Sequence, residues 1–388
     1  MPQSWSTPCG VLKVKYNELL QRVKLKARCI VRGDQETAVD AKAGRPPAET
    51  FAPTVRHSTV KLLMASGVVR SAQANAAPVR QRSFDITAAF LQGKPPQDRI
   101  RYVLPPPGCQ SYDRRGIRIV WQLIGNVYGT TTAPRVWNQS LHEFLTSPRD
   151  PALDKLSVDE IMKLEKVTGG LGLTQSDYDP CYYYTQYDAH QRLDLAMYVD
   201  DGWVTDNAGV HADRDLALLN RRFGLTVVEH PTHFLNMNVH QVSPTKMKLT
   251  SEAYIVSMAD RYVPNWRERG PVPMPSTDKL MPAYERALLR EHDIDPKLVK
   301  TYGGKVGALV YTSPCVRSDA CATIARLSRA LTFPTPELDG MADDCIVYMA
   351  QTADLGITLD GTVAGAERCS AESDSDWAVG HSTTGWCC

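Results

Sequence analysis

The amino-acid sequence predicts an α+β fold, on three observations. Several short stretches alternate apolar and polar residues, a period of two that is typical of strands with one buried face. Other stretches space their apolar residues three and four positions apart, which is typical of helices. At 388 residues the chain is long enough for two or three domains of about 150 residues each.

The first predicted elements form a basic hairpin. Residues 11–16 alternate, with Val11, Lys13 and Lys15 on one face, and residues 23–32 follow a similar pattern. A basic two-stranded ribbon could contact phosphates, or its lysines could simply keep an exposed edge soluble. Pattern alone leaves both alternatives open.

Three helices are predicted further along the chain. Residues 59–72 and 210–223 carry apolar side chains at helical spacing, and Gly224 is a natural stop for the second of them. Residues 133–144 are predicted to form a helix entered through Pro134. Residues 271–275 are predicted to be a linker before a more helical C-terminal third.

The composition excludes several classes of protein. With 43% hydrophobic and 22% charged residues, the chain is not predominantly disordered. No apolar run approaches the ~18 residues of a membrane span, and the N-terminus lacks a secretory signal, so we expect an intracellular protein without a membrane partner. The ten cysteines are scattered without a C-x-x-C pair, which indicates reduced thiols.

Charge is unevenly distributed although the net charge is only +1. Residues 1–33 hold seven basic side chains and one acid, whereas residues 337–376 hold ten acids and one base. A uniformly basic nucleic-acid binder is excluded, but a local basic patch is not.

The strongest local signal lies between residues 193 and 204. Two apolar, strand-like runs flank Asp200, Asp201 and Gly202, which predicts a hairpin with adjacent carboxylates at its tip. Asp-Gly is also a favoured turn dipeptide, so a purely structural explanation stays open. Two carboxylates at a turn equally offer the hard oxygen ligands that Mg²⁺ prefers.

A third carboxylate, Asp85, interrupts the apolar run 83–91. An unpaired buried carboxylate costs several kcal/mol, so we expect Asp85 to be paired, exposed or metal-bound. Three carboxylates on neighbouring strands could hold two Mg²⁺ ions ~3.5–4 Å apart. Phe90, five residues further on, could contact the sugar of a nucleotide or could be an ordinary core side chain.

A set of short boxes then appears in one order along the chain. They lie at residues 26–33, 49–56, 84–93, 128–129, 133–137, 179–182, 198–201 (the Y-x-D-D box), 234–237, 249–254, 306–309, 317–319 and 327–329. Together they resemble the reverse transcriptase of copia-type (Pseudoviridae-like) LTR retrotransposons over about residues 11–388. A chance Y-x-D-D in an unrelated enzyme would require all the other boxes to be coincidences.

The resemblance implies a right-hand polymerase fold of fingers, an antiparallel-sheet palm and a thumb. Its expected parts are fingers and palm (1–245), a thumb-like segment and linker (246–300), a helical connection (301–366) and the start of a ribonuclease H domain (367–388).

The resemblance also implies the site residues and the ligands. Asp85, Asp200 and Asp201 are the expected catalytic carboxylates, with Asp85 and Asp200 holding the metals most directly. The expected nucleotide-binding residues are Phe90, as a gate against the ribonucleotide 2′-hydroxyl, together with Tyr128, Gly129, Lys26 and Arg28. The implied cofactor is a pair of Mg²⁺ ions, with Mn²⁺ as an alternative, and the implied partners are dNTPs and a primed RNA or DNA template. The implied location is a cytoplasmic or nuclear retroelement particle; self-association stays open.

The last residues resemble the first strand of a ribonuclease H domain. Asp374 would be the first metal carboxylate of that domain, and the sequence stops at Cys388 before the others. We therefore expect no working ribonuclease H and a fragment of a longer polyprotein.

The sequence departs from the family at four places. Thr130–Thr132 replace L-K-Q, and Asn236 replaces a glycine, so that a close backbone approach would be lost there. Asp343 and Asp344 stand in a helix that is basic in the family, and residues 148–166 are an insertion. These departures leave two hypotheses, an active divergent polymerase or an inactive relic that at most binds nucleic acid.

Overall fold

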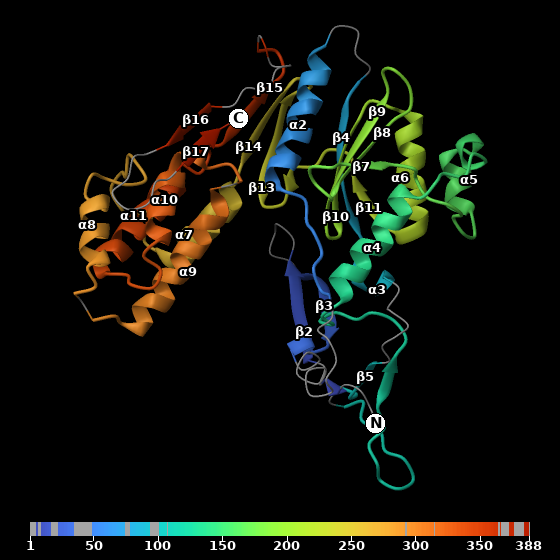
Figure 1. Cartoon of the computed structure of the whole chain (residues 1–388), viewed down its shortest axis with the longest axis horizontal. Helices are drawn as coiled ribbons and strands as arrows, with labels where there is room; N and C mark the ends of the chain where they lie inside the picture. The colour runs from blue at the N-terminus through green and yellow to red at the C-terminus, as the bar shows by residue number, and fades with distance from the viewer. Residues whose placement is uncertain are drawn as a thin grey trace. The chain divides into compact units, whose positions relative to one another are not determined.

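The structure is a computed structural model of the chain, and it divides into two compact units (Figure 1). Unit 1 comprises Met1–Arg56 and Ser83–Val228, and unit 2 comprises His57–Arg82 and Glu229–Cys388. The described residues are 5–6, 9–16, 22–34, 49–73, 78–93, 101–106, 108–291, 293–313, 315–363, 365, 372–375 and 384–387; for 5–29, 372–375 and 384–387 the backbone alone is described.

Unit 1 is centred on a six-stranded sheet in the order β11-β4-β10-β9-β8-β7. The strands are β4 (Arg80–Ile86), β7 (Thr174–Gln175), β8 (Tyr182–Gln186), β9 (Arg192–Tyr198), β10 (Asp201–Asp206) and β11 (Leu225–Val228). The pairs β11–β4, β10–β9, β9–β8 and β8–β7 are antiparallel. The central strands β9 and β10 are almost entirely buried, because their apolar residues face the helices and the neighbouring strands.

Two helices of unit 1 meet through aromatic side chains. Helix α4 (Ala133–Thr146) starts with a proline in its first turn, and α6 (Val210–Phe223) ends at Gly224, whose φ is +74°. The Phe223 ring makes edge contacts with Trp137 and Phe144 of α4, with centroids 5.2 and 5.3 Å apart. The structure confirms both predicted helices and their start and stop signals.

The insertion is a folded cap on α6. It contains a 3₁₀ turn (η1, Leu153–Lys155) and helix α5 (Val158–Lys163), which begins with a capping box of Ser157 and Glu160. Arg214 donates to the Leu156 carbonyl at 2.7 Å, and Arg221 donates to the carbonyls of Leu164 and Glu165. Arginines of α6 therefore satisfy carbonyls that the insertion leaves unpaired.

The basic ribbon predicted near the N-terminus is present. Strand β2 (Cys9–Tyr16) pairs antiparallel with β3 (Arg22–Ile30), with Lys13 opposite Lys26 and Val11 opposite Arg28. A separate three-stranded sheet in unit 1 has the order β1-β5-β6, formed by Trp5–Ser6, Arg101–Val103 and Trp121–Leu123. The short helix α3 (Ala89–Gln92) follows β4.

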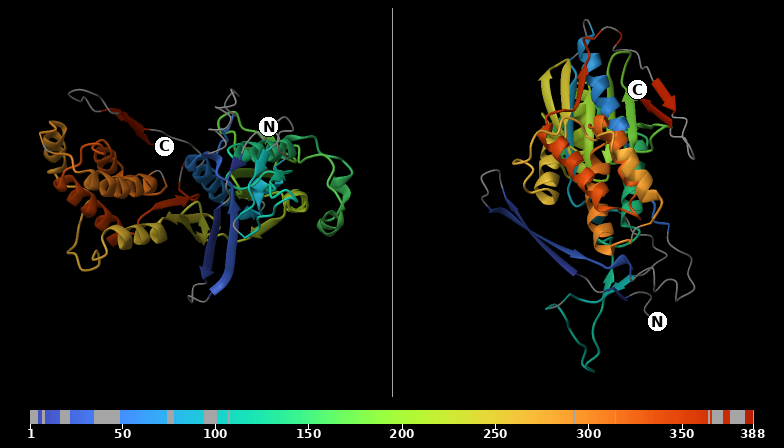
Figure 2. Two further views of the ribbon diagram at one scale, coloured as in Figure 1. Left: turned by 90° about the horizontal axis from the view of Figure 1, so that it is seen from below. Right: turned by 90° about the vertical axis from the view of Figure 1, so that its left-hand side faces the viewer.

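Unit 2 combines a four-stranded sheet with helices. The sheet order is β12-β13-β14-β15 (His233–Phe234, Met237–Ser243, Lys246–Thr250, Ile357–Asp360). The helices are α2 (His57–Ala72), α7 (Glu252–Tyr262), α8 (Leu280–Leu288), α9 (Pro296–Thr312), α10 (Cys321–Ser328) and α11 (Pro336–Gln351), with a 3₁₀ turn η2 (Ser318–Ala320). Figure 2 shows α7–α11 gathered in one bundle, as the predicted helical C-terminal third requires.

One buried cation organises the helical bundle. Arg317 is fully buried, pairs with Asp319 at 2.8 Å and donates to the Met349 and Thr352 carbonyls at the end of α11. Burial raises the pKa of the Asp319 carboxyl, but hydrogen bonds from Arg317 and Tyr348 outweigh it and bring the pKa below its usual value. The pair therefore stays ionised while it caps the helix.

The unexpected acids of α11 are also in ion pairs. Asp343 lies 2.7 Å from the Lys305 ammonium, and Asp344 lies 2.6 Å from the Arg269 guanidinium. They are therefore part of the packing of unit 2 rather than an unpaired acidic surface.

The C-terminal strands β16 (Glu372–Ser375) and β17 (Thr384–Cys387) pair antiparallel and place Asp374 within a strand. The Asp374 side chain lies outside the described residues, so its metal role stays a prediction. The predicted parts 1–245, 246–300, 301–366 and 367–388 also stay predictions. No helix within the described residues has the length and apolar character needed to span a bilayer.

A glycine in β10 is predicted to be irreplaceable. A Cβ at Gly202 would lie 2.2 Å from the buried Phe84 ring of β4. We expect Gly202→Ala to lower the free energy of unfolding by about 1–3 kcal/mol, because the ring must move within a packed core. Urea unfolding followed by circular dichroism measures this.

The matched control is Gly307→Ala, since no atom lies within 4 Å of a Cβ at that exposed position of α9. It should stabilise the protein by up to about 1 kcal/mol through helix propensity. Equal stability of Gly202→Ala and the wild type would contradict the packing of Phe84 described above.

Candidate active site

The β9–β10 hairpin carries the two adjacent carboxylates. Tyr198 pairs with Asp201, so the turn consists of Val199 and Asp200 alone. The predicted hairpin is confirmed. The predicted position of its turn, at Asp200–Gly202, is wrong, because Asp201 and Gly202 already lie in β10. Gly202 is not part of the turn; its lack of a side chain lets the Phe84 ring pack closely against β10.

The turn holds an unfavourable backbone conformation. Val199 has a φ of +59°, which is rare for a β-branched residue. Two hydrogen bonds hold the turn in place: the Trp137 indole N–H donates to the Val199 carbonyl at 2.7 Å, and the Ile86 N–H donates to the Asp200 carbonyl at 2.8 Å. Such strain persists only where the surroundings fix the backbone.

The three predicted carboxylates come together at this turn. Phe84 lies over Gly202 and Ile86 bonds to Asp200, so β4 and β10 run antiparallel with Asp85 opposite Asp201. Burial, and then the charges of Asp200 and Asp85, raise the pKa of Asp201 from 3.8 to about 6. The three negative charges therefore repel one another across neighbouring strands.

The donor set fits a divalent cation that also needs ligands from outside the protein. Within the described part of the chain, no three or more His, Cys, Asp or Glu side chains form a ready metal-binding cluster. Mg²⁺ typically uses one or two carboxylates and completes its shell with water and substrate phosphates. A cation would also relieve the repulsion from Asp200 and Asp85, which adds to burial in raising the pKa of Asp201.

Three of the expected nucleotide-binding residues, Phe90, Tyr128 and Gly129, lie close together in unit 1. Phe90 of α3 makes an edge contact with Tyr128, with ring centroids 6.2 Å apart. The Tyr128 carbonyl accepts a hydrogen bond from the Val31 N–H at 2.8 Å. Gly129 has a φ of +89°, and the nearby Val31 carbonyl leaves no space for a Cβ at this position. The end of β3 is therefore attached to this segment. Lys26 and Arg28 lie in β3, but their side chains are outside the described residues, so their roles stay predictions.

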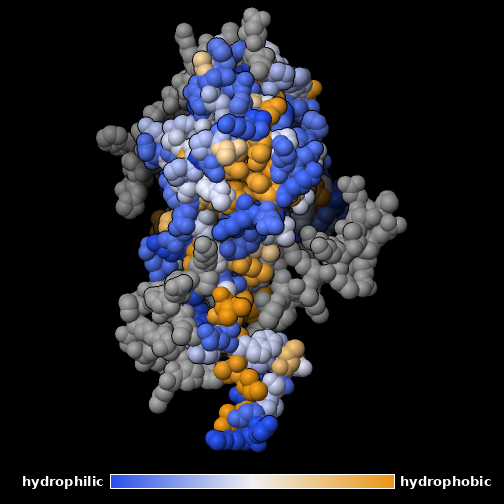
Figure 3. Space-filling model, turned by 90° about the vertical axis from the view of Figure 1, so that its right-hand side faces the viewer, coloured by the Kyte–Doolittle hydropathy of each residue, from blue (hydrophilic) through white to orange (hydrophobic). Residues whose placement is uncertain are grey.

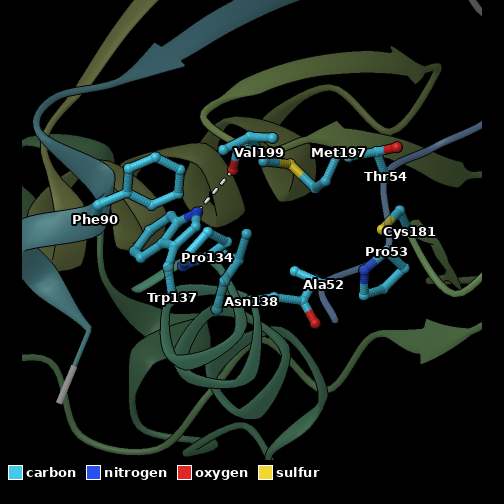
Figure 4. A pocket seen from close by; sticks show the side chains of 11 residues that line it. Ala52, Pro53, Thr54, Phe90, Pro134, Trp137, Asn138, Cys181, Met197 and Val199 are labelled. Atoms are coloured by element: carbon cyan, nitrogen blue, oxygen red, sulfur yellow. Dashed lines mark hydrogen bonds between the residues drawn. The ribbon is translucent and has the colours of Figure 1, made fainter. Parts of the chain in front are cut away.

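A cavity of about 200 Å³ opens next to the turn (Figure 4). Its wall is mostly apolar and comes from residues 52–54, α3, α4, the start of β8 and the end of β9. The lining residues are Ala52, Pro53, Thr54, Phe90, Pro134, Trp137, Asn138, Leu141, Cys181, Met197 and Val199. Phe90 is partly exposed on this wall rather than sealed in the core.

Other boxes support the hairpin from behind. The Val55 N–H donates to the Met197 carbonyl at 3.3 Å, and the Met197 N–H donates to the Cys181 carbonyl at 2.8 Å. The buried Asp179 carboxylate accepts the N–H groups of Arg56 and Cys181, both at 3.0 Å. Sequence analysis assigned no role to Trp137 or Asp179, although their position inside the boxes was a signal.

Two departures from the family are accommodated by new contacts. Thr132 accepts a hydrogen bond at 2.9 Å from the buried Arg101 of β5, so the threonine segment has a structural partner. Leu235 and Asn236 form the β12–β13 turn, both with positive φ, and Asn236 donates to the Tyr311 hydroxyl at 2.8 Å. Asparagine tolerates this conformation and gains that contact.

Comparisons with known proteins point to the same family that the sequence boxes resemble. Residues 4–155 match the family described as reverse transcriptase (RNA-dependent DNA polymerase). The chain is 28% and 27% identical to the retrovirus-related Pol polyproteins of the transposons RE1 and RE2 of Arabidopsis thaliana, over 94% of this chain.

The resemblance to copia-type retrotransposon reverse transcriptases is confirmed. The chain spans about a fifth of the length of the two Arabidopsis polyproteins. A putative transposon Ty5-1 protein of Saccharomyces cerevisiae is 26% identical over 64% of this chain and 70% of its own length.

Among solved structures, a telomerase from Candida albicans in complex with a fragment of telomeric RNA is 10% identical and covers 91% of this chain and 67% of its own, with a TM-score of 0.30. A TM-score of that size carries no argument about the fold.

Burial of the Asp201 carboxylate, together with repulsion from Asp200 and Asp85, predicts a pH-dependent gain of stability in Asp201→Asn. The raised pKa of Asp201 means that the folded protein binds this proton more tightly than the unfolded chain. The ionised group therefore destabilises the fold above pH about 6, and the penalty disappears as the pH falls through 6 toward 3.8. In EDTA, Asp201→Asn should be about 1 kcal/mol more stable than the wild type at pH 8, after allowance for solvent screening, and equal to it at pH 4.

Thermal unfolding at the two pH values measures the difference. Asp177→Asn, an exposed acid of the same unit, is the control and should change stability at neither pH. A gain for Asp201→Asn that did not depend on pH would contradict the electrostatic origin.

Proposed function

We propose that the chain is an RNA-directed DNA polymerase that transfers a nucleotidyl group from a dNTP to a primer 3′-hydroxyl. The observation that carries the proposal is the convergence of Asp85, Asp200 and Asp201 at one held turn beside an apolar cavity. The family match supports the reaction class.

The carboxylates would hold two Mg²⁺ ions, with Mn²⁺ as an alternative. Asp85 and Asp200 would be the direct ligands, and Asp201 would complete the negative field. When bound, the ions supply activation of the primer hydroxyl and neutralisation of the leaving pyrophosphate. The protein contributes position, since the bonds from Trp137 and Ile86 fix the turn before substrate arrives.

The cavity would receive the base pair that forms at each step. Its wall is apolar, so it makes few base-specific hydrogen bonds and suits all four bases. Phe90 would lie against the sugar and disfavour a 2′-hydroxyl, with Tyr128 and Gly129 beside it. Lys26 and Arg28 would contact the triphosphate or the template.

In this proposal the chain has a right-hand architecture. The six-stranded sheet with the carboxylates would be the palm, and the β2–β3 ribbon would belong to the fingers. The helices of unit 2 would include the thumb and connection, and β16 would be the first ribonuclease H strand.

A second candidate is a retroelement relic that binds nucleic acid without polymerising. It is favoured by the lack of a ready metal-binding cluster within the described residues and by the Thr130–Thr132 segment. It shares the predicted nucleic-acid partners, so only a catalytic assay separates the two candidates.

The decisive test is dNTP incorporation on poly(rA)/oligo(dT) with Mg²⁺. The wild type should extend the primer, and Asp200→Asn/Asp201→Asn should lose about a hundredfold or more, because the charges that hold the ions are removed. Asp177→Asn should retain full activity. A folded, template-binding wild type that incorporates nothing would favour the relic.

Phe90→Ala tests the sugar gate. We expect incorporation of rNTP relative to dNTP to rise by about tenfold, since the ring no longer excludes the 2′-hydroxyl. Single-nucleotide extension with each substrate measures the ratio, and Leu91→Ala, an exposed neighbour, should leave it unchanged. An unaltered ratio in Phe90→Ala would place the gate elsewhere.

A further inference from the structure

A hairpin outside the candidate active site presents an unusual surface. Residues 111–121, called the arginine hairpin below, lead into β6 of unit 1. The Ile119 N–H donates to the Ser111 carbonyl and the Asp113 N–H to the Ile117 carbonyl, both at 2.9 Å, and Gly116 has a φ of +74° at the tip. The backbone of the hairpin is therefore regular and closed.

Large apolar side chains of the arginine hairpin face solvent. The exposed fractions are 59% for Tyr112, 60% for Ile117, 42% for Ile119 and 44% for Trp121, and Ile124 just beyond reaches 92%. In the lowest part of Figure 3, hydrophobic and hydrophilic residues lie side by side on this segment. Such a cluster on a folded unit typically marks a binding surface.

Positive charge accompanies the exposed rings. Arg114 and Arg115 are exposed, and within the described residues neither makes an ion pair. Arg118 lies on the same hairpin, and its Nε has no hydrogen-bond partner there. The nearby acid, Asp113, accepts the N–H groups of Arg115 and Ile117 at 2.8 Å, so its carboxylate is directed at the backbone of the turn.

We propose that the arginine hairpin binds single-stranded nucleic acid. Arginines would contact successive phosphates, while Tyr112 and Trp121 offer ring faces on which unpaired bases stack. Charge complementarity selects this occupant, because an apolar partner protein would leave the cluster of guanidinium groups unpaired at its interface. Stacking and phosphate contacts distinguish no particular base, so binding is tolerant of sequence.

The hairpin is connected to the candidate nucleotide pocket. β6 leads directly to Asn126, whose amide donates to the Gly93 carbonyl at 3.2 Å, and then to Tyr128. Its partner strand β5 carries Arg101, which donates to Thr132 at the start of α4. These connections would fix the position of a nucleic-acid strand bound at the hairpin relative to the candidate nucleotide pocket. That this strand is the template rests on the proposed function, whereas binding itself does not.

The test uses the full chain and fluorescently labelled oligo(rU), with fluorescence anisotropy at several salt concentrations. The triple variant Arg114→Ala/Arg115→Ala/Trp121→Ala should bind about a hundredfold more weakly, and its log–log salt slope should fall by about 1.4, at about 0.7 per lost phosphate contact. The control is Lys163→Ala/Lys166→Ala/Tyr178→Ala, which removes the same number of exposed cations and one exposed ring elsewhere in unit 1. It should bind like the wild type.

Primer extension separates this proposal from the proposed function. Asp200→Asn/Asp201→Asn should keep wild-type affinity for oligo(rU) while losing incorporation, and the hairpin variant should incorporate normally on a template with a one-nucleotide overhang but poorly on a long overhang. Wild-type affinity and salt slope in a folded hairpin variant would overturn the proposal. A changed oligomeric state by sedimentation with unchanged affinity would overturn it in favour of contact between copies of the chain.

Discussion

The candidate site depends on one constraint, the fixed two-residue turn between β9 and β10. Val199 occupies a backbone conformation that its branched side chain disfavours, and an isolated hairpin would relax it. The Trp137 indole and the Ile86 amide hold the two turn carbonyls from opposite neighbours, α4 and β4. These two hydrogen bonds fix the position of Asp200 relative to α4 and β4.

The same geometry brings like charges together at a cost. Asp85 and Asp201 lie on adjacent strands where Phe84 packs over Gly202, and burial, followed by the charges of Asp200 and Asp85, raises the pKa of Asp201. In the proposed function a cationic ligand would relieve this repulsion, and the apolar wall beside it would strengthen the interaction by excluding water. The hydrogen bonds that hold the turn and the charges of the carboxylates thus act together at one place.

Departures from the family pattern are absorbed by local chemistry. The threonine segment places a hydroxyl on a buried arginine, the insertion ends on arginines of α6, and the acids of α11 find Lys305 and Arg269. Each of these contacts joins groups of one unit, and such pairing is what buried polar groups require. The departures from the family sequence therefore leave the contacts that hold the β9–β10 turn in place.

Local pattern determined much of this protein. Helical spacing and stop signals located α2, α4 and α6, alternation located the basic ribbon and the β9–β10 hairpin, and the order of the boxes indicated the family, because these signals depend on near neighbours in the chain. The placement of the turn at Val199–Asp200, the cavity, and the surface of the arginine hairpin required tertiary structure. Turn position depended on Phe84 over Gly202, more than a hundred residues apart in sequence, and exposure of Trp121 depended on what else packs nearby. Contacts between distant segments leave no periodic trace in either segment, which is why only the folded chain discloses them.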